Sequence, residues 1–186
     1  MNDDAQLIDQ ALAGQSVAFG RLVTKYQDRL YNALVHVVGS AEEAKDVAQD
    51  AFVQAFLKLD SFQRSAAFYT WLYRIAFNLA ISRFRKTKPT VSVDRARESS
   101  GQEIMARDPP PGERLEQQER AQQVQLALAA LDEHHRAVLV LREIDGCSYE
   151  AIAEILDLPV GTVRSRLHRA RMELRELLKG VVQEER

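Results

Sequence analysis

Hydrophobic residues recur at helical spacing along most of the chain, and this pattern predicts an all-α protein. A first helix is expected to end at Gly14, and Ser16 is expected to cap the second. Gly39 follows the last apolar position of that second helix and is predicted to end it, because glycine readily adopts the left-handed conformation of helix C-termini. Residues 40–43, with the sequence SAEE, form a capping box and predict the start of a third helix.

A loop over residues 60–66 is predicted to separate the third helix from a fourth. Phe52 and Phe56 are expected on the apolar side of the third helix, whose other side is polar. The fourth helix is expected to turn Trp71 and its helical neighbours inward, to become basic near its end, and to stop at Pro89. The first 88 residues therefore predict a bundle of about four helices with one basic end.

The apolar pattern stops between residues 87 and 112, where Ser, Arg, Asp and Glu dominate and the sequence PPPG closes the stretch. Such composition is typical of a linker. We therefore expect two small helical domains, residues 1–88 and 113–186, joined by a linker over residues 89–112. Four helices are predicted in the second domain, followed by a frayed polar tail from Gly180 onward.

Residues 148–178 predict a short helix, a tight turn and a longer helix. Ser148 is expected to cap the short helix, and Asp157-Leu158-Pro159 to end it. The longer helix is predicted from about Val160, with one apolar side and one basic side. Its basic side is formed by Arg164, His168, Arg171 and Arg175, flanked by Ser165 and Arg169. This pattern favours a helix-turn-helix that places its second helix in a DNA major groove; the alternative is a solvated basic face.

The first residues of that longer helix, Gly161 and Thr162, offer backbone N–H groups that can meet a phosphate. Charge is unevenly distributed: residues 160–179 carry six basic and two acidic side chains, whereas residues 121–159 carry two basic and seven acidic ones. The formal net charge of the whole chain is −2. Because phosphate neutralisation supplies much of DNA affinity, we expect weak binding to free DNA and a need for a partner.

Catalytic and metal-binding patterns are not found in the sequence. Cys147 is the single cysteine, which excludes an internal disulfide and fits a reducing cytoplasm. His134 and His135 are adjacent, so a helix would point them about 100° apart and make them poor joint ligands. We therefore expect no enzymatic activity, no metal and no cofactor. The sequence also contains no apolar run long enough to span a membrane. In the loop after the third helix, Phe62 could stack on an exposed base.

Two separate segments resemble one known family. The sequences DVAQDAFVQAFLKL (residues 46–59) and FYTWLYRIAFNLA (68–80) are similar to the second region of extracytoplasmic-function (ECF) sigma factors of the sigma-70 family. SYEAIAEILDLPVGTVRSRLHRAR (148–171) is similar to the fourth region. The two segments stand in the family's order with a linker between them. The resemblance implies a subunit that binds core RNA polymerase and directs promoter-specific initiation without covalent chemistry of its own.

The resemblance also implies roles for particular residues. The polar side of the third helix would dock on the clamp helices of the largest polymerase subunit, through Asp46, Gln49, Asp50, Gln54 and Lys58. The following loop and helix would capture the −10 element and help to open the duplex, through Phe62, Gln63, Arg64, Ser65, Asn78, Arg83, Arg85 and Lys86. The helix-turn-helix would contact the −35 element through Arg164, Ser165, His168, Arg169 and Arg171.

The resemblance further implies control by an anti-sigma factor and action in the cytoplasm. The promoter elements lie about 25 base pairs apart, or about 85 Å, whereas a free coil of the linker's length spans only about 28 Å. We therefore expect the free protein to be compact or loosely hinged. Two alternatives remain open at this point: a helix-turn-helix repressor or activator that binds a palindrome as a dimer, and an interaction protein that sequesters a partner.

Overall fold

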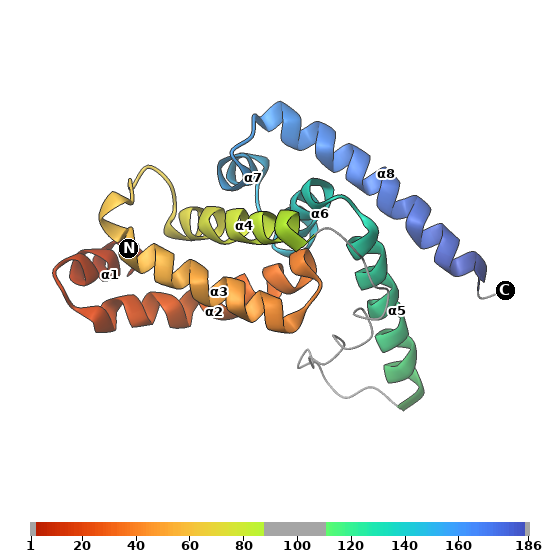
Figure 1. Ribbon diagram of the computed structural model, residues 1–186, viewed down its shortest axis with the longest axis horizontal. Coiled ribbons are helices and arrows are strands. Elements are labelled where there is room, and N and C mark those ends of the chain that lie inside the picture. Colours follow the sequence, from red (N-terminus) through yellow and green to blue (C-terminus); the bar gives the residue numbers. More distant parts are fainter. Residues whose placement is uncertain (1–2, 88–110, 185–186) are drawn as a thin grey trace.

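The computed structural model describes residues 3–87 and 111–184, and all regular secondary structure in these ranges is helical (Figure 1). The first half, residues 3–87, contains α1 (Asp3–Leu12), α2 (Ser16–Val38), α3 (Ala41–Leu57), the 3₁₀ turn η1 (Leu59–Ser61) and α4 (Phe68–Thr87). The second half, residues 111–184, contains α5 (Pro111–Ala130), α6 (Glu133–Leu139), the π-helix η3 (Val140–Ile144), α7 (Tyr149–Leu156) and α8 (Val160–Glu184). The predicted all-α fold is confirmed.

Local capping chemistry explains the junction between α2 and α3. Gly39 ends α2 in the left-handed conformation, with φ of 75°, and its N–H donates to the carbonyl of Val35 at 2.9 Å. Ser40 caps α3, where its hydroxyl accepts from the N–H of Glu43 at 3.3 Å. The predicted cap at Ser16 is wrong, because α2 begins at that residue and Gln15 is the N-cap without a side-chain bond. A backbone turn therefore replaces the side-chain cap there.

The helix-turn-helix forms as the sequence predicts. The hydroxyl of Ser148 accepts from the N–H of Ala151 at 3.1 Å and caps α7. Asp157 ends α7 in the left-handed region, with φ of 55°, and α8 starts at Val160. The predicted frayed tail from Gly180 is wrong, because α8 continues to Glu184: one glycine lowers helix propensity by only about 1 kcal/mol, which neighbouring residues can offset.

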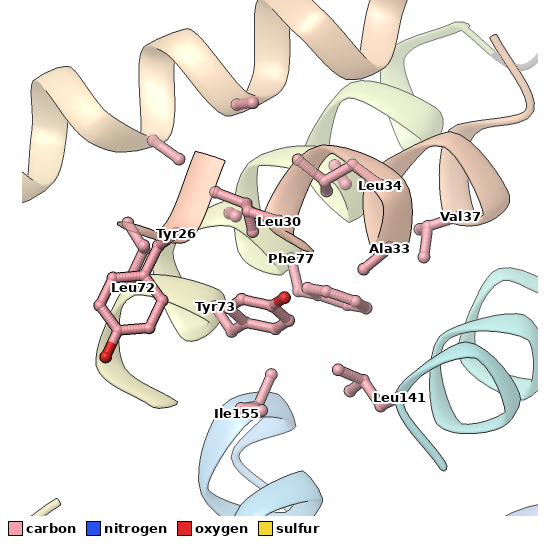
Figure 2. Close-up of a cluster of buried hydrophobic side chains, with 14 of the residues drawn as sticks. Tyr26, Leu30, Ala33, Leu34, Val37, Leu72, Tyr73, Phe77, Leu141 and Ile155 are labelled. Atoms are coloured by element: carbon pink, nitrogen blue, oxygen red, sulfur yellow. The ribbon is translucent and has the colours of Figure 1, made fainter. Parts of the chain in front are cut away.

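The two halves pack against each other around one continuous apolar core. Helix α7 lies beside α4, and α5 and η3 approach α2 (Figure 1). Leu141 of η3 and Ile155 of α7 point toward the rings of Tyr73 and Phe77 on α4 (Figure 2), and all four side chains are fully buried. We call this contact the seam.

The predicted domain boundaries stay a prediction. The expected linker, residues 89–112, and the expected helix stop at Pro89 fall mainly on residues 88–110, outside the described residues. The last two positions of that expected linker belong to α5, which starts at Pro111 rather than at residue 113. Proline is well suited to the first turn of a helix, because its missing N–H would have no helical partner there.

Candidate nucleic-acid interface

Helix α8 presents its two sides as a DNA-reading helix requires. Val163, Leu167 and Ala170 are buried against the rest of the second half. Most residues predicted to contact DNA lie exposed on the other side: Gly161, Arg164, Ser165, His168, Arg169 and Arg171. Thr162 is half-buried, and its carbonyl accepts from the hydroxyl of Ser165 at 3.0 Å. The structure therefore brings all seven predicted residues together on the first three turns of one helix.

An aromatic ring supports the first arginine of this set. The guanidinium of Arg164 lies 6.0 Å from the ring centre of Tyr149, and that of Arg142 lies 5.0 Å from the same ring. Arg142 also donates to the carbonyl of Cys147 at 2.8 Å, which anchors it beside α7. Sequence reasoning missed Tyr149 and Arg142, because both lie outside the longer helix that carries the periodic basic side.

Arg171 is already engaged by a carboxylate within the protein. Its Nε and Nη2 donate to one oxygen of Glu143 on η3, at 3.0 and 2.6 Å. These hydrogen bonds raise the pKa of Arg171 above its ordinary value. Contact with a DNA phosphate would therefore have to compete with Glu143, whereas no such pair involves Arg169 among the interactions of the described residues.

The loop between η1 and α4 holds its aromatic residue against the bundle. Phe62 is half-buried, with its ring 5.8 Å from that of Phe68 and 5.1 Å from that of Trp71, measured between centroids. Gln63, Arg64 and Ser65 are exposed beside it.

Arg64 in this loop forms an ion pair with Asp9 of α1, which lowers the pKa of that carboxyl. Two of the predicted −10 residues thus contact neighbouring helices: the ring of Phe62 packs on α4, and the charge of Arg64 pairs with α1. The loop is held against α1 and α4.

The remaining predicted −10 residues lie on α4. Asn78 is exposed, and Arg83 forms an ion pair with Asp50 of α3. Arg85 and Lys86 lie on the last turns of α4, and their side chains fall outside the part of the chain that the structure describes. The Arg83–Asp50 pair joins the predicted −10 set to the predicted polymerase set.

Helix α3 exposes both polar and apolar side chains. Asp46, Gln49, Asp50 and Lys58 are exposed and Gln54 is half-buried, which places the predicted polymerase-docking residues on the outer surface. On the same helix, three large apolar side chains are also exposed: Val53 at 52%, Phe56 at 48% and Leu57 at 72%. The prediction that Phe56 lies on the buried side is only partly right, since one edge of its ring contacts Phe19 at 5.1 Å between centroids.

Val53 and Leu57 were not among the predicted residues, although their spacing of four residues, outside the buried stripe, was a usable signal. Among the described residues, no group of three or more His, Cys, Asp or Glu side chains could hold a metal ion. In the same ranges, none of the helices has the length and apolar character needed to cross a membrane.

Comparison with known proteins assigns both halves. Residues 22–90 match the family model "Sigma-70 region 2", and residues 121–174 match "Sigma-70, region 4". The ECF RNA polymerase sigma factor SigW of Bacillus subtilis is 39% identical over 181 residues, covering 94% of this chain and 96% of the relative. The ECF RNA polymerase sigma-E factor of Escherichia coli K12 is 40% identical over 176 residues, covering 90% of both chains.

Solved structures agree with this assignment. CnrH, in complex with the cytosolic domain of CnrY, superposes with a TM-score of 0.69 and 32% identity, covering 96% of this chain and 99% of CnrH. The sigma factor RpoE of Bartonella quintana, in complex with the anti-sigma factor NepR, gives a TM-score of 0.65 and 29% identity, covering 87% of this chain and 96% of RpoE.

A basic helix-turn-helix joined to a second helical bundle defines a transcription regulator with two binding modules. Among transcription regulators, the chain is similar to sigma factors along nearly its whole length. The chain belongs to the sigma-70 family, within its extracytoplasmic-function group.

Proposed function

We propose that this sigma factor acts in the cytoplasm by joining core RNA polymerase and carrying it to promoters, with binding and strand opening as its whole contribution and no covalent chemistry. The observation that carries the assignment of roles is the exposure, on separate helices, of two sets of side chains. One set lies on α3 and the other on α8. We assign each set to a different partner.

In this proposal α8 contacts the −35 element. Arg164 and Arg169 are exposed and can pair with guanine edges through two hydrogen bonds each, while Ser165 and His168 lie between them. The backbone N–H of Gly161 holds a phosphate at the start of the helix, whereas the N–H of Thr162 is engaged by the carbonyl of Pro159 at 2.9 Å and would have to exchange that acceptor. Arg171 serves the phosphate backbone after exchanging its partner Glu143.

The −10 element is assigned to the loop and α4. Gln63 and Ser65 are exposed for hydrogen bonds to the edge of a flipped base, and Phe62 with Trp71 supplies an aromatic floor. Asn78 on α4 continues this surface, and Arg64, Arg83, Arg85 and Lys86 are assigned to the strand backbone.

The clamp helices of the largest polymerase subunit are assigned to α3. The exposed carboxylate of Asp46 provides charge, as does that of Asp50 after exchanging its partner Arg83. The side chains of Gln49, Gln54 and Lys58 provide hydrogen bonds, and Val53 and Leu57 add exposed apolar area. A polar rim around an apolar centre is the usual composition of a protein interface. Control by an anti-sigma factor is supported by CnrH and RpoE, whose structures contain CnrY and NepR.

Reconstituted run-off transcription tests the proposal. With purified core polymerase and a promoter library, the wild-type chain should yield transcripts sharing two sequence elements. The double variant R164A/R169A should lose −35-dependent initiation, by roughly 5- to 150-fold for each arginine, because a bidentate guanine contact contributes about 1–3 kcal/mol. The matched control K179A changes an exposed basic residue on the same helix and should behave as wild type.

A parallel pair of variants tests the polymerase surface. D46A/Q49A should weaken binding to core polymerase, whereas K45A, next to Asp46 on the exposed side of α3, should not. Tight binding of the lone chain to a symmetric operator, without transcription in the presence of polymerase, would contradict the proposal and favour a repressor.

A further inference from the structure

One buried carboxylate joins the two halves of the molecule. Asp145 follows η3, and its side chain is only 5% exposed. Arg29 of α2 donates from Nε to Oδ1 at 2.9 Å, and from Nη2 to Oδ2 and to the backbone carbonyl, both at 3.0 Å. Tyr73 of α4 donates to Oδ1 at 3.2 Å, and the thiol of Cys147 to Oδ2 at 3.2 Å. Four donor groups from both halves thus converge on Asp145.

Further contacts between the halves surround this carboxylate. The guanidinium of Arg29 lies 5.2 Å from the ring centre of Tyr69, which holds it along α4. The buried Arg136 of α6 donates to the carbonyl of Val37 at the end of α2 at 2.8 Å. At the surface, Arg74 of α4 approaches Asp157 of the helix-turn-helix turn at 3.6 Å. Together with the apolar seam, these contacts fix the second half on one face of the first.

This arrangement conflicts with simultaneous binding of two promoter elements. Helices in direct contact, as α4 and α7 are, have axes about 8–10 Å apart. The −10 helix and the helix-turn-helix are therefore neighbours, whereas the two elements are separated by about 85 Å of duplex. The halves have to separate before both can be engaged.

We propose that the second half docks on α2 and α4 as a built-in resting state, locked by the Arg29–Asp145 pair. This inference rests on the proposed function. The occupant of the α2–α4 face is the chain's own second half, identified by the seam and by the charge complementarity of Arg29 with Asp145. Polymerase binds the separated form, so its apparent affinity is the intrinsic affinity multiplied by the fraction of chain that is open. No anti-sigma factor is needed for this restraint.

The variant R29A opens the lock without touching the proposed DNA or polymerase residues, and K25A is its matched control. Lys25 lies one turn earlier on α2 and pairs with Asp4 inside the first half, at 2.5 Å. In small-angle scattering of the lone chain, wild type and K25A should give a radius of gyration of about 16 Å, while R29A should move toward about 23 Å, as for two domains on a coil.

The single cysteine supplies a second readout. Cys147 is buried at the lock, so its alkylation should be slow in wild type and K25A and about tenfold faster in R29A, in proportion to the open fraction. R29K, which keeps the charge but not the paired hydrogen bonds, should lie between them. Circular dichroism of each variant should show the helical content of wild type.

Core-polymerase affinity then decides whether closure restrains function. R29A should bind about tenfold more tightly than K25A, which follows from the larger open fraction. A wild-type radius near 23 Å would overturn the closed state, and equal polymerase affinities of R29A and K25A would overturn the restraint. Failure of transcription by the wild type would instead count against the proposed function, and would leave the scattering result standing.

Discussion

At the scale of single residues, several side chains act by holding another side chain in place. Tyr149 is the clearest case, since its ring lies within cation–π distance of both Arg142 and Arg164 although it belongs to α7 and not to α8. An arginine side chain loses considerable rotamer freedom when it binds a base edge. A ring that already restricts Arg164 reduces that loss, so Tyr149 is expected to contribute to −35 binding without reading a base.

Replacement of Tyr149 tests this. Y149L should weaken −35-dependent promoter binding by the polymerase complex about two- to fivefold, because an exposed cation–π contact contributes about 0.5–1 kcal/mol. Y149F keeps the ring and should retain wild-type binding in the same filter-binding or mobility-shift titration. Equal losses in both variants would indicate that the hydroxyl group, and not the ring, matters.

At the scale of helices, short sequence signals determine where elements begin and end. Ser148 and Ser40 each cap a helix through a hydroxyl that accepts from the N–H three residues later. Ser16 has the same residue type before an apolar stripe, yet it lies inside α2 and makes no cap. Residue type therefore does not identify a cap unless the backbone of that residue itself is extended, as it is at Ser148 and Ser40.

Two alanine variants separate these cases. S148A should lower the free energy of unfolding by about 1 kcal/mol, because the N–H of Ala151 loses its acceptor. S16A should leave it unchanged within about 0.5 kcal/mol, since no cap is lost. Urea denaturation followed by circular dichroism measures both values. A loss in S16A equal to that in S148A would contradict the assigned start of α2.

The same contrast explains how far sequence analysis could go. The helix-turn-helix, the ends at Gly39 and Asp157, and the exposed basic side of α8 follow from neighbouring residues, and each was predicted. The contact of Arg29 with Asp145 joins positions 116 residues apart, and no periodicity or cap carries that information. The contact of Arg164 with Tyr149 could not be predicted for the same reason, since it depends on how α7 crosses α8.

At the scale of the whole molecule, polar contacts between the two halves add to the apolar seam. His36 of α2 is hydrogen bonded to Gln125 of α5, at the opposite end of α2 from α1. Burial lowers the pKa of His36 below its ordinary value of 6.5, and the hydrogen bond from Gln125 only partly opposes this. The closed molecule therefore contains an imidazole that favours the neutral form.

This shift predicts a dependence of stability on pH. Between the lowered pKa and 6.5, the unfolded chain binds more protons at position 36 than the folded chain does. The contribution of His36 is complete above pH 6.5 and is lost as the pH falls through the lowered pKa. H36Q should therefore show a smaller decrease in unfolding free energy than wild type between pH 7.5 and pH 5.5, in urea titrations. Parallel decreases would rule out His36 as the source.

The seam has a practical consequence for experiments on isolated modules. Tyr73 and Phe77 are completely shielded in the intact chain, and part of that shielding comes from Leu141 and Ile155. A fragment that stops after α4 would present these rings to water, and large exposed apolar patches promote self-association. Affinities measured with such a fragment would include non-specific binding through apolar surface that is buried in the full-length polypeptide. A polymerase that separates the halves must in turn cover both of the exposed faces.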